Sequence, residues 1–336
     1  MPNGVAVRFG AWAGKSLPRL TEWACRLHDN RQPFMDGVLV IDKPAGLTSH
    51  DVVNRVRGIL HERSVGHLGT LDPLATGVLP LVAGRMTRLA QFYTASEKTY
   101  EGVIRFGFAT DTYDAEGEPL AEPQTIKATL EQLRELSARF QGRIRQMPPP
   151  FSAKKIHGVP AYKLARKHRE VELEPVEVEI KEFDLCDWDG ENARFRARVA
   201  SGTYMRSVAH EMGQILGCGA HLASLRRTAL GEFALSDAHC LEDLEQTAQQ
   251  GRAEELFIHP RKLLPEMPGV TANEEMLARI RVGRAVNLPE LSRARQVKVF
   301  YGQSELIAIA TRVAGTLFHP KIVLAAEPQP TGERAH

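Results

Sequence analysis

A helical pattern of apolar residues occupies the stretch 48–61. Its members are Val52, Val53, Val56, Ile59 and Leu60. Thr48 and Ser49 are both candidate N-caps, and Asp51 falls in the first turn, where an acidic side chain is favourable. This spacing predicts an amphipathic helix of about three turns that ends near His61.

A buried strand is predicted soon afterwards, because the apolar run at residues 78–84 is short and is bounded by glycines. The chain between the helix and this strand is rich in glycine and carries Asp72 and Pro73. An Asp before a Pro commonly opens a turn or caps a helix. On spacing alone, Asp72 is therefore more often a turn residue than a catalytic one.

Two later stretches, 176–181 and 195–199, alternate apolar and charged residues. This alternation is typical of half-exposed antiparallel strands. Helical patterns occupy residues 126–140 and 205–216. Strands and helices that mix without a regular βαβ rhythm predict the α+β class.

A second unit is expected after the polar, helix-like stretch 241–253. A short helical pattern at 274–282 is followed by strand patterns at 296–300 and 306–311. The chain has 336 residues, a length that predicts about two domains and allows a sizeable core.

The composition, with 43% hydrophobic and 25% charged residues, is that of an ordinary globular protein. No apolar run reaches transmembrane length, and no charged start leads into a cleavable hydrophobic segment, so we expect a cytoplasmic protein without a membrane anchor. The cysteines form no Cys-x-x-Cys pair, which suits a reducing compartment and predicts no metal site. They are Cys25, Cys186, Cys218 and Cys240.

Basic residues are concentrated in the stretch 143–169, although the whole chain has a formal net charge of only +2. This stretch holds no Asp or Glu, and Phe151 and Tyr162 are among its aromatic residues. The basic residues are Arg143, Arg145, Lys154, Lys155, Lys163, Arg166, Lys167 and Arg169. Such a patch suits phosphate contacts and stacking on unpaired bases, although a basic stretch is more often a solvated face. The prolines at 148–150 and the Gly-Val-Pro at 158–160 predict a projecting loop with a short helix.

Residues 67–77 read His-Leu-Gly-Thr-Leu-Asp-Pro-Leu-Ala-Thr-Gly. This run closely resembles the central motif of the TruB family of pseudouridine synthases, which isomerise a uridine in the T loop of tRNA. A match of this length rarely arises by chance, and further segments extend the resemblance over about residues 36–325. The resemblance implies that Asp72 is the catalytic carboxylate and that His67 enters the T loop.

Two of these segments come from the first third of the chain. Residues 37–46 look like the family's opening strand and turn, which implies that Lys43 supports the active-site loop. Residues 98–100 look like the next motif, which implies that Tyr100 lies against the target base. Without the resemblance, Tyr100 is equally consistent with a structural tyrosine in a sheet, because strands are rich in aromatic residues.

Two further segments lie beyond residue 200. Residues 201–207 resemble the motif that supplies an arginine to the catalytic aspartate, which implies this role for Arg206 and a supporting one for Tyr204. A guanidinium in contact with Asp72 opposes the rise in pKa that burial causes. Residues 219–227 resemble the following motif, which implies that Leu225 packs beside the site.

The basic stretch, taken as residues 143–170, resembles the family's thumb, which clasps the RNA stem-loop. The candidate RNA contacts in it are Arg143, Lys154, Lys155, Tyr162 and Arg166. The sequence departs from the usual family pattern at Leu68, Phe151 and His168, which leaves the thumb geometry and the substrate preference open.

The resemblance also divides the chain into parts. Residues 35–250 would form the catalytic domain, with the pseudouridine synthase fold around a central mixed, largely antiparallel sheet. Residues 255–326 would form a small PUA-like RNA-binding domain, and 327–336 a tail. Residues 1–34 precede the match and are expected to be loosely ordered, with Met35 as an alternative start.

The expected activity is isomerisation of the T-loop uridine of tRNA, conventionally position 55, by a monomer that needs no cofactor, metal or obligatory protein partner. The bond from the sugar to N1 breaks, the base rotates, and the sugar joins C5, so no redox step is involved. Asp72 can add to the ring at C6 or act at the sugar, and the sequence leaves both routes open. Two alternatives remain, namely a guide-RNA-dependent synthase subunit and an RNA-binding or RNA-folding protein in which catalysis is secondary.

Overall fold

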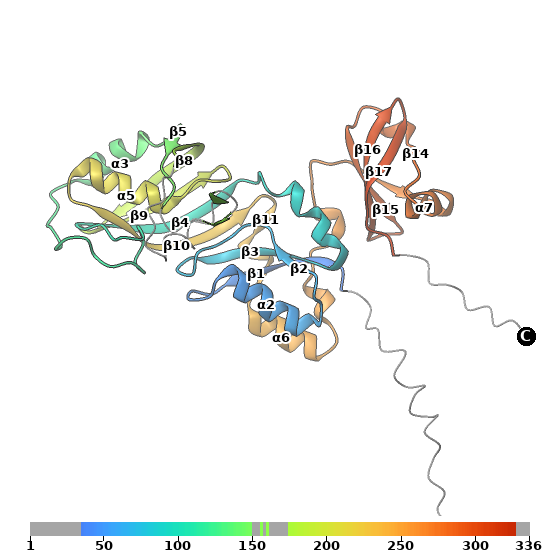
Figure 1. Cartoon of the computed structure of the whole chain (residues 1–336), viewed down its shortest axis with the longest axis horizontal. Coiled ribbons are helices and arrows are strands. Elements are labelled where there is room, and N and C mark those ends of the chain that lie inside the picture. The colour runs from blue at the N-terminus through green and yellow to red at the C-terminus, as the bar shows by residue number, and fades with distance from the viewer. Residues whose placement is uncertain (1–34, 150–154, 157–158, 161–173, 327–336) are drawn as a thin grey trace, which may run out of the picture. The chain divides into compact units, whose positions relative to one another are not determined.

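The computed structural model describes residues 35–149, 155–156, 159–160 and 174–326 (Figure 1). Within them the chain forms a ten-stranded sheet, a five-stranded sheet near the C-terminus and a two-stranded ribbon. Helices and strands mix without a regular βαβ rhythm, so the predicted α+β class is confirmed.

The ten-stranded sheet carries the candidate site. The strands of its main path are, in order, β12 (Ala238–His239), β1 (Gly37–Lys43), β3 (Thr76–Ala83), β10 (Ala220–Leu230), β4 (Lys98–Phe106), β9 (Asn192–Val199), β8 (Val176–Trp188) and β5 (Gly142–Gln146). Two short strands join it at the side, β2 (Val65–His67) on β3 and β11 (Phe233–Ala234) on β10. The β1–β12 and β3–β10 pairs are parallel and the other strand pairs are antiparallel, as the prediction of a mixed, largely antiparallel sheet requires.

Two pairs of helices pack on this sheet in different regions (Figure 1). The first pair is α2 (Ser49–Leu60) with α6 (Leu241–Gln249), and the second is α3 (Leu130–Ala138) with α5 (Met205–Leu216). Both pairs cover one large apolar core, to which β1 and β3 contribute Leu39, Ile41, Leu79 and Leu81. The residues on the opposite face of β1 and β3 are buried in a second core. Because both faces are buried, the sequences of these strands are continuous apolar runs.

The predicted helix at 48–61 is α2, and its ends follow the sequence signals. Thr48 is the N-cap: its hydroxyl accepts from the backbone N–H of Asp51, and the Asp51 carboxylate accepts from that of Thr48. His61 ends the helix in the left-handed conformation, with φ 51°. Ser49, the other candidate cap, points elsewhere and bonds the candidate catalytic loop.

Other predicted elements differ in length. The pattern at 126–140 gives a helix only from Leu130 to Ala138, because Thr129 caps its start. The strand expected at 176–181 extends to Trp188 as β8. The sequence patterns did not reveal β2 or the 3₁₀ helix η1 (Gly84–Phe92).

The C-terminal part forms its own five-stranded sheet. Its strands are, in order, β13 (Gly269–Ala272), β15 (Gln296–Tyr301), β16 (Glu305–Ala314), β17 (Leu317–Val323) and β14 (Val286–Asn287), and it is joined by the helix α7 (Glu274–Arg281). A separate core that includes Leu277, Val299 and Phe318 lies within this domain. A small C-terminal β domain is therefore present, while its RNA-binding role stays a prediction.

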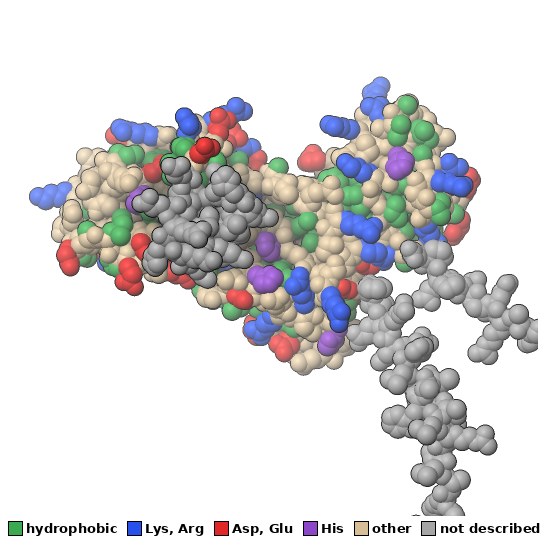
Figure 2. All heavy atoms as spheres, viewed as in Figure 1, with side chains coloured by type: hydrophobic (Ala, Val, Ile, Leu, Met, Phe, Trp, Pro, Cys, Tyr) green, Lys and Arg blue, Asp and Glu red, His purple; other side chains and the backbone are tan. Residues whose placement is uncertain are grey.

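Several predicted RNA contacts lie outside the described residues, namely Lys154, Tyr162 and Arg166, as do the segments 1–34 and 327–336. Of the thumb, the structure describes residues 143–149, in which β5 continues to Gln146, and two short strands that pair antiparallel, β6 (Lys155–Ile156) and β7 (Val159–Pro160). The side chain of Lys155 is not described. No helix in the described part of the chain combines the length and apolar character needed to span a membrane. On the face shown in Figure 2, basic and acidic side chains are mixed, as a net charge of +2 implies.

Candidate active site

A cavity of about 510 Å³ brings together most of the residues that the sequence singled out. Its walls come from β2, the loop between β2 and β3, β4, β10 and the start of α5. The predicted site residues that line it are His67, Asp72, Tyr100, Tyr204, Arg206 and Leu225. Segments far apart in sequence thus meet at one hollow, and of the other predicted residues that the structure describes, Lys43 and Arg143 do not line it.

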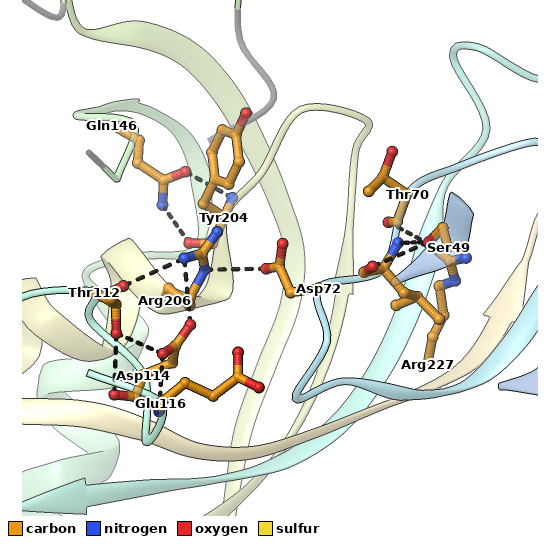
Figure 3. Close-up of polar contacts among 11 residues, drawn as sticks. Ser49, Thr70, Asp72, Thr112, Asp114, Glu116, Gln146, Tyr204, Arg206 and Arg227 are labelled. Carbon is orange, nitrogen blue, oxygen red and sulfur yellow. Dashed lines mark hydrogen bonds and ion pairs between the residues drawn. The ribbon is translucent and has the colours of Figure 1, made fainter. Parts of the chain in front are cut away.

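Asp72 lies in the loop between β2 and β3, and its carboxylate pairs with Arg206 (Figure 3). Arg206 Nε is 3.0 Å from Asp72 Oδ2. The Asp72 side chain is 40% exposed, whereas that of Arg206 is only 6% exposed. Burial raises the pKa of Asp72, and the Arg206 guanidinium opposes this rise. Arg206 therefore favours the charged form of a carboxylate that remains accessible.

Arg206 also contacts a second carboxylate, Asp114, which the sequence analysis missed (Figure 3). Arg206 Nη1 is 3.3 Å from Asp114 Oδ2, and the Asp114 side chain is only 4% exposed. The Thr112 hydroxyl and the Glu116 backbone N–H both donate to Asp114 Oδ1, at 2.6 and 3.1 Å. One buried guanidinium thus serves two carboxylates, and the charge of Asp114 adds to the rise in the pKa of Asp72.

Arg227 holds the first part of the candidate catalytic loop, between β2 and β3, through backbone carbonyls. Its guanidinium donates to the oxygens of Gly69 at 2.9 Å, Thr70 at 3.2 Å and Val78 at 2.8 Å. The residue is fully buried. Because these bonds span the loop and β3, Arg227 fixes the backbone that leads to Asp72. Arg227 lies inside a segment that resembles a family motif, yet nothing in its spacing indicated this role.

Two side chains hold the rest of this loop. The Ser49 hydroxyl accepts from the backbone N–H of Leu71 at 2.8 Å and donates to its carbonyl at 3.0 Å. Lys43, which is fully buried, donates to the carbonyl of Pro73 at 3.2 Å and to those of Pro44 and Leu47. Burial lowers the pKa of Lys43 to about 8, although the Asp72 charge works against this change. Lys43 thus lies behind the loop rather than in the cavity wall.

Tyr100 is both a buried strand residue and part of the cavity wall. It lies on β4 opposite Arg227 of β10. Burial raises the pKa of Tyr100, while the Arg227 charge acts in the opposite direction. The phenol therefore stays protonated at neutral pH, and the Tyr100 side chain forms part of the cavity wall.

Gln146 anchors the start of α5, and the sequence analysis missed it as well. Its side-chain amide accepts from the backbone N–H of Tyr204 at 2.8 Å and donates to the Tyr204 carbonyl at 3.0 Å (Figure 3). The Ser207 hydroxyl donates to the carbonyl of Met147 at 2.7 Å. The helix that carries Arg206 is thus joined to the first residues of the thumb.

Three further predicted residues, His67, Leu225 and Arg143, differ in their surroundings. His67 is half-buried; burial and then the Arg227 charge lower its pKa, so its ring is neutral at neutral pH. Leu225 lies between two register shifts of β10 and also lines a second cavity, of about 670 Å³. Arg143 is exposed on β5 and is not among the residues that line either cavity. The described residues contain no cluster of three or more His, Cys, Asp or Glu side chains that could hold a metal ion.

Comparison with protein families gives two adjoining matches. Residues 57–205 match the model described as TruB family pseudouridylate synthase (N terminal domain). Residues 206–267 match the model described as tRNA pseudouridylate synthase B C-terminal domain. The first match contains Asp72 and Tyr100, and the second contains Arg206 and Arg227.

Curated relatives and solved structures agree with these matches. The chain is 51% identical over 293 residues to tRNA pseudouridine synthase B of Solibacter usitatus, covering 86% of this chain and 100% of the relative. It is 40% identical over 282 residues to the protein of the same name from Bacillus cereus, covering 82% and 92%. A structure of an H/ACA RNP bound to a substrate RNA containing 2′-deoxyuridine matches with a TM-score of 0.64 at 22% identity, covering 86% of this chain and 85% of the other. A Cbf5–Nop10–Gar1 complex matches with a TM-score of 0.62 at 25% identity, covering 83% and 79%.

Proposed function

The chain belongs to the TruB family of pseudouridylate synthases, and we propose that it converts the T-loop uridine of tRNA to pseudouridine as a stand-alone enzyme. It is an enzyme of the isomerase class by this membership. The relatives' name supports tRNA as the substrate class. The T-loop position, a monomeric cytoplasmic enzyme and the independence from cofactors and guide RNA are parts of the proposal.

One observation carries the catalytic assignment: the accessible carboxylate of Asp72 is held 3.0 Å from the buried Arg206, in a cavity that Tyr100 also lines. In the reaction the bond between N1 and C1′ breaks, the uracil rotates, C1′ joins C5, and the C5 proton leaves. Asp72 acts in its ionised form, either by adding to C6 or at the sugar. Tyr100 contacts the uracil ring with its aromatic surface.

The target uridine must leave the folded loop before it reaches this cavity, as in other enzymes that act on bases. We propose that His67, at the rim of the catalytic loop, occupies the space that the base leaves. Its neutral ring can stack against neighbouring bases without a charge to solvate. Within residues 35–250 the thumb would grip the stem, and the domain at 255–326 would add PUA-like RNA contacts.

The T-loop position and the independence from cofactors and guide RNA can be tested together. The measurement is release of tritium from C5 of uridine in a T-arm hairpin. One hairpin carries the label only at the T-loop target, and a second has cytidine there and labelled uridines elsewhere. We expect release from the first alone, with EDTA present and no guide RNA added. Release from both hairpins would contradict the proposed position.

The guide-dependent alternative is supported by the likeness of fold to the H/ACA and Cbf5 structures. The 51% and 40% identical relatives, both named tRNA pseudouridine synthase B, favour the stand-alone enzyme. Activity that appears only after addition of a guide RNA would decide for the alternative. Tight RNA binding without any release would favour a binding or folding protein.

A further inference from the structure

Lys98 lines the same cavity as Asp72, and it has no role in the reaction described above. It is the first residue of β4 and precedes Tyr100 by two positions, so both side chains leave the same face of the strand. Its stem runs along the catalytic loop, since a methyl group placed on Gly69 would lie 3.8 Å from Lys98 Cε. Lys98 is thus part of the wall next to the site of the reacting base.

The Lys98 ammonium has few partners in the protein. It donates to the carbonyl of Ser96 at 2.9 Å, and among the described residues it makes no other hydrogen bond and no ion pair. An ammonium carries three donors. The other lysine beside the loop, Lys43, donates to three carbonyls, and Lys181 on β8 pairs with Glu97. Lys98 therefore retains donors that a ligand in the cavity can use.

The charges around Lys98 also favour an anion. Burial and the neighbouring Arg227 charge lower the pKa of Lys98 to about 8. No carboxylate of the described residues forms an ion pair with the Lys98 ammonium, so this charge has no acidic partner in direct contact. An anionic group that enters the cavity would stabilise the charged lysine and gain a charge-assisted hydrogen bond.

We propose that Lys98 and the cavity wall around it form a phosphate subsite, which binds a backbone phosphodiester of the RNA beside the nucleotide that reacts at Asp72. The inference rests on the proposed function, since it takes RNA as the ligand. Bases are neutral, so phosphodiesters are the anions that such a strand brings. Tyr100 and Asp72 mark the place of the base, and Lys98, two residues along β4, lies where the backbone of the same strand can pass.

The test measures binding of a T-arm hairpin over a range of NaCl concentrations, with Asp72→Asn in all proteins so that no turnover occurs. Lys98→Met keeps the stem and removes the charge, whereas Lys98→Arg keeps the charge. Lys181→Met is the matched control, because it removes an equal charge from a lysine that is paired and does not line the cavity. Removing a half-buried charge that forms no ion pair with a described residue is not expected to unfold the sheet.

At low salt we expect Lys98→Met to bind about tenfold more weakly than the parent, as for the loss of one charge-assisted contact. Its slope of log affinity against log salt should fall by about 0.7 to 0.9, the value for one phosphate contact. Lys98→Arg and Lys181→Met should keep the parent slope. A slope for Lys98→Met equal to that of Lys181→Met overturns the subsite, even if the affinity falls. If the parent protein does not bind the hairpin, the proposed function is contradicted. If the parent binds and the Lys98 variants have its affinity and salt slope, only the subsite is contradicted.

Discussion

Arg206 divides its charge between Asp72 and Asp114, and this division affects the ionisation of Asp72, the proposed catalytic carboxylate. Burial and the Asp114 charge raise the pKa of Asp72, and Arg206 lowers it. The group loses its charge as the pH falls through the raised pKa. Activity that requires the ionised form should therefore disappear on the acidic side at a pH above the ordinary 3.8 of an aspartate.

This division predicts opposite shifts of the acidic limb of kcat/KM in two variants. Asp114→Asn removes a like charge, and Arg206 then pairs with Asp72 alone. The pKa of Asp72 should fall, so the acidic limb should move to lower pH. Arg206→Gln removes the opposing charge, so the limb should move to higher pH. The midpoint of the acidic limb is the readout, because it does not depend on any change in the maximal rate. Asp42→Asn is the control, because Asp42 pairs with Arg226 and does not line the cavity. A limb that stays in place in both variants would contradict this role of Arg206.

Lys43 gives a pH dependence of stability with a definite sign. Its folded pKa of about 8 lies below the ordinary 10.5, so between these values the unfolded chain binds more protons. Stability contributed by this group therefore rises as the pH increases from about 8 towards 10.5. Lys43→Met abolishes this dependence, so the difference in Tm between wild type and variant should grow in favour of wild type from pH 7 to pH 9.5. A difference that shrinks over this range would show that the lysine is not held in a low-pKa environment.

At the scale of elements, the catalytic loop between β2 and β3 is defined by the side chains behind it. The carbonyls of residues 69–73 all accept hydrogen bonds, from Arg227, Ser49, the backbone N–H of Ala75, Lys43 and the backbone N–H of Gly46. These hydrogen bonds favour a single conformation of the loop. Preorganisation of this kind lowers the cost of aligning the reacting groups.

Arg227→Gln should therefore reduce the rate of the chemical step. The variant loses the bonds to Gly69, Thr70 and Val78, and misplacement of Asp72 by about 1 Å would cost about 10²-fold in kcat. RNA affinity should change little, since Arg227 is buried behind the loop. Arg226→Gln is a matched control, because its neighbour Arg226 instead binds Asp42 and Thr76. Equal single-turnover rates for the two variants, measured well below their Tm, would contradict the positioning role.

Some elements could be predicted from the sequence because their signals are local. Thr48, Asp51 and the apolar spacing define α2, and the apolar run of β3 reflects burial on both faces. Asp114 and Gln146 gave no signal, because each is a single polar residue whose partner is far away in the chain. The Ser49 role was hidden by its position at the start of a helix, where a serine is normally a cap. The predicted pairing of Asp72 with Arg206 came from the family motifs, since no spacing rule joins a loop to a distant helix.

At the scale of the whole chain from residue 35 to 326, the second core joins the ten-stranded sheet to the C-terminal domain. It combines Val40 and Val82 of the large sheet with Phe300 and Ile309 of the small one. The Glu232 carboxylate adds polar links, accepting from the Tyr93 hydroxyl at 2.8 Å and from the backbone N–H of Leu264 at 2.9 Å. The two sheets therefore share apolar burial, and we expect them to unfold together.

Phe233 lies in this shared core and is almost fully buried. Phe233→Ala should lower the free energy of unfolding by about 3 to 5 kcal/mol, the usual cost of such a cavity. Denaturant unfolding followed by circular dichroism should still show one transition. The kcat of the folded fraction should be retained, because Phe233 does not line the catalytic cavity. A loss below about 1 kcal/mol, or two separate transitions, would contradict a shared core.

The central claim, that Asp72 performs the chemistry, is tested most directly by tritium release from C5-labelled T-arm RNA in a single turnover with enzyme in excess. Wild type, Asp72→Asn and the control Asp42→Asn are compared, and RNA binding and Tm are measured on the same samples. Asp72→Asn should bind the RNA and keep its Tm, because it replaces a carboxylate whose charge is disfavoured by burial, yet release no tritium above the blank. Asp42→Asn should release tritium at the wild-type rate. Release by Asp72→Asn at the wild-type rate would instead remove Asp72 from the mechanism.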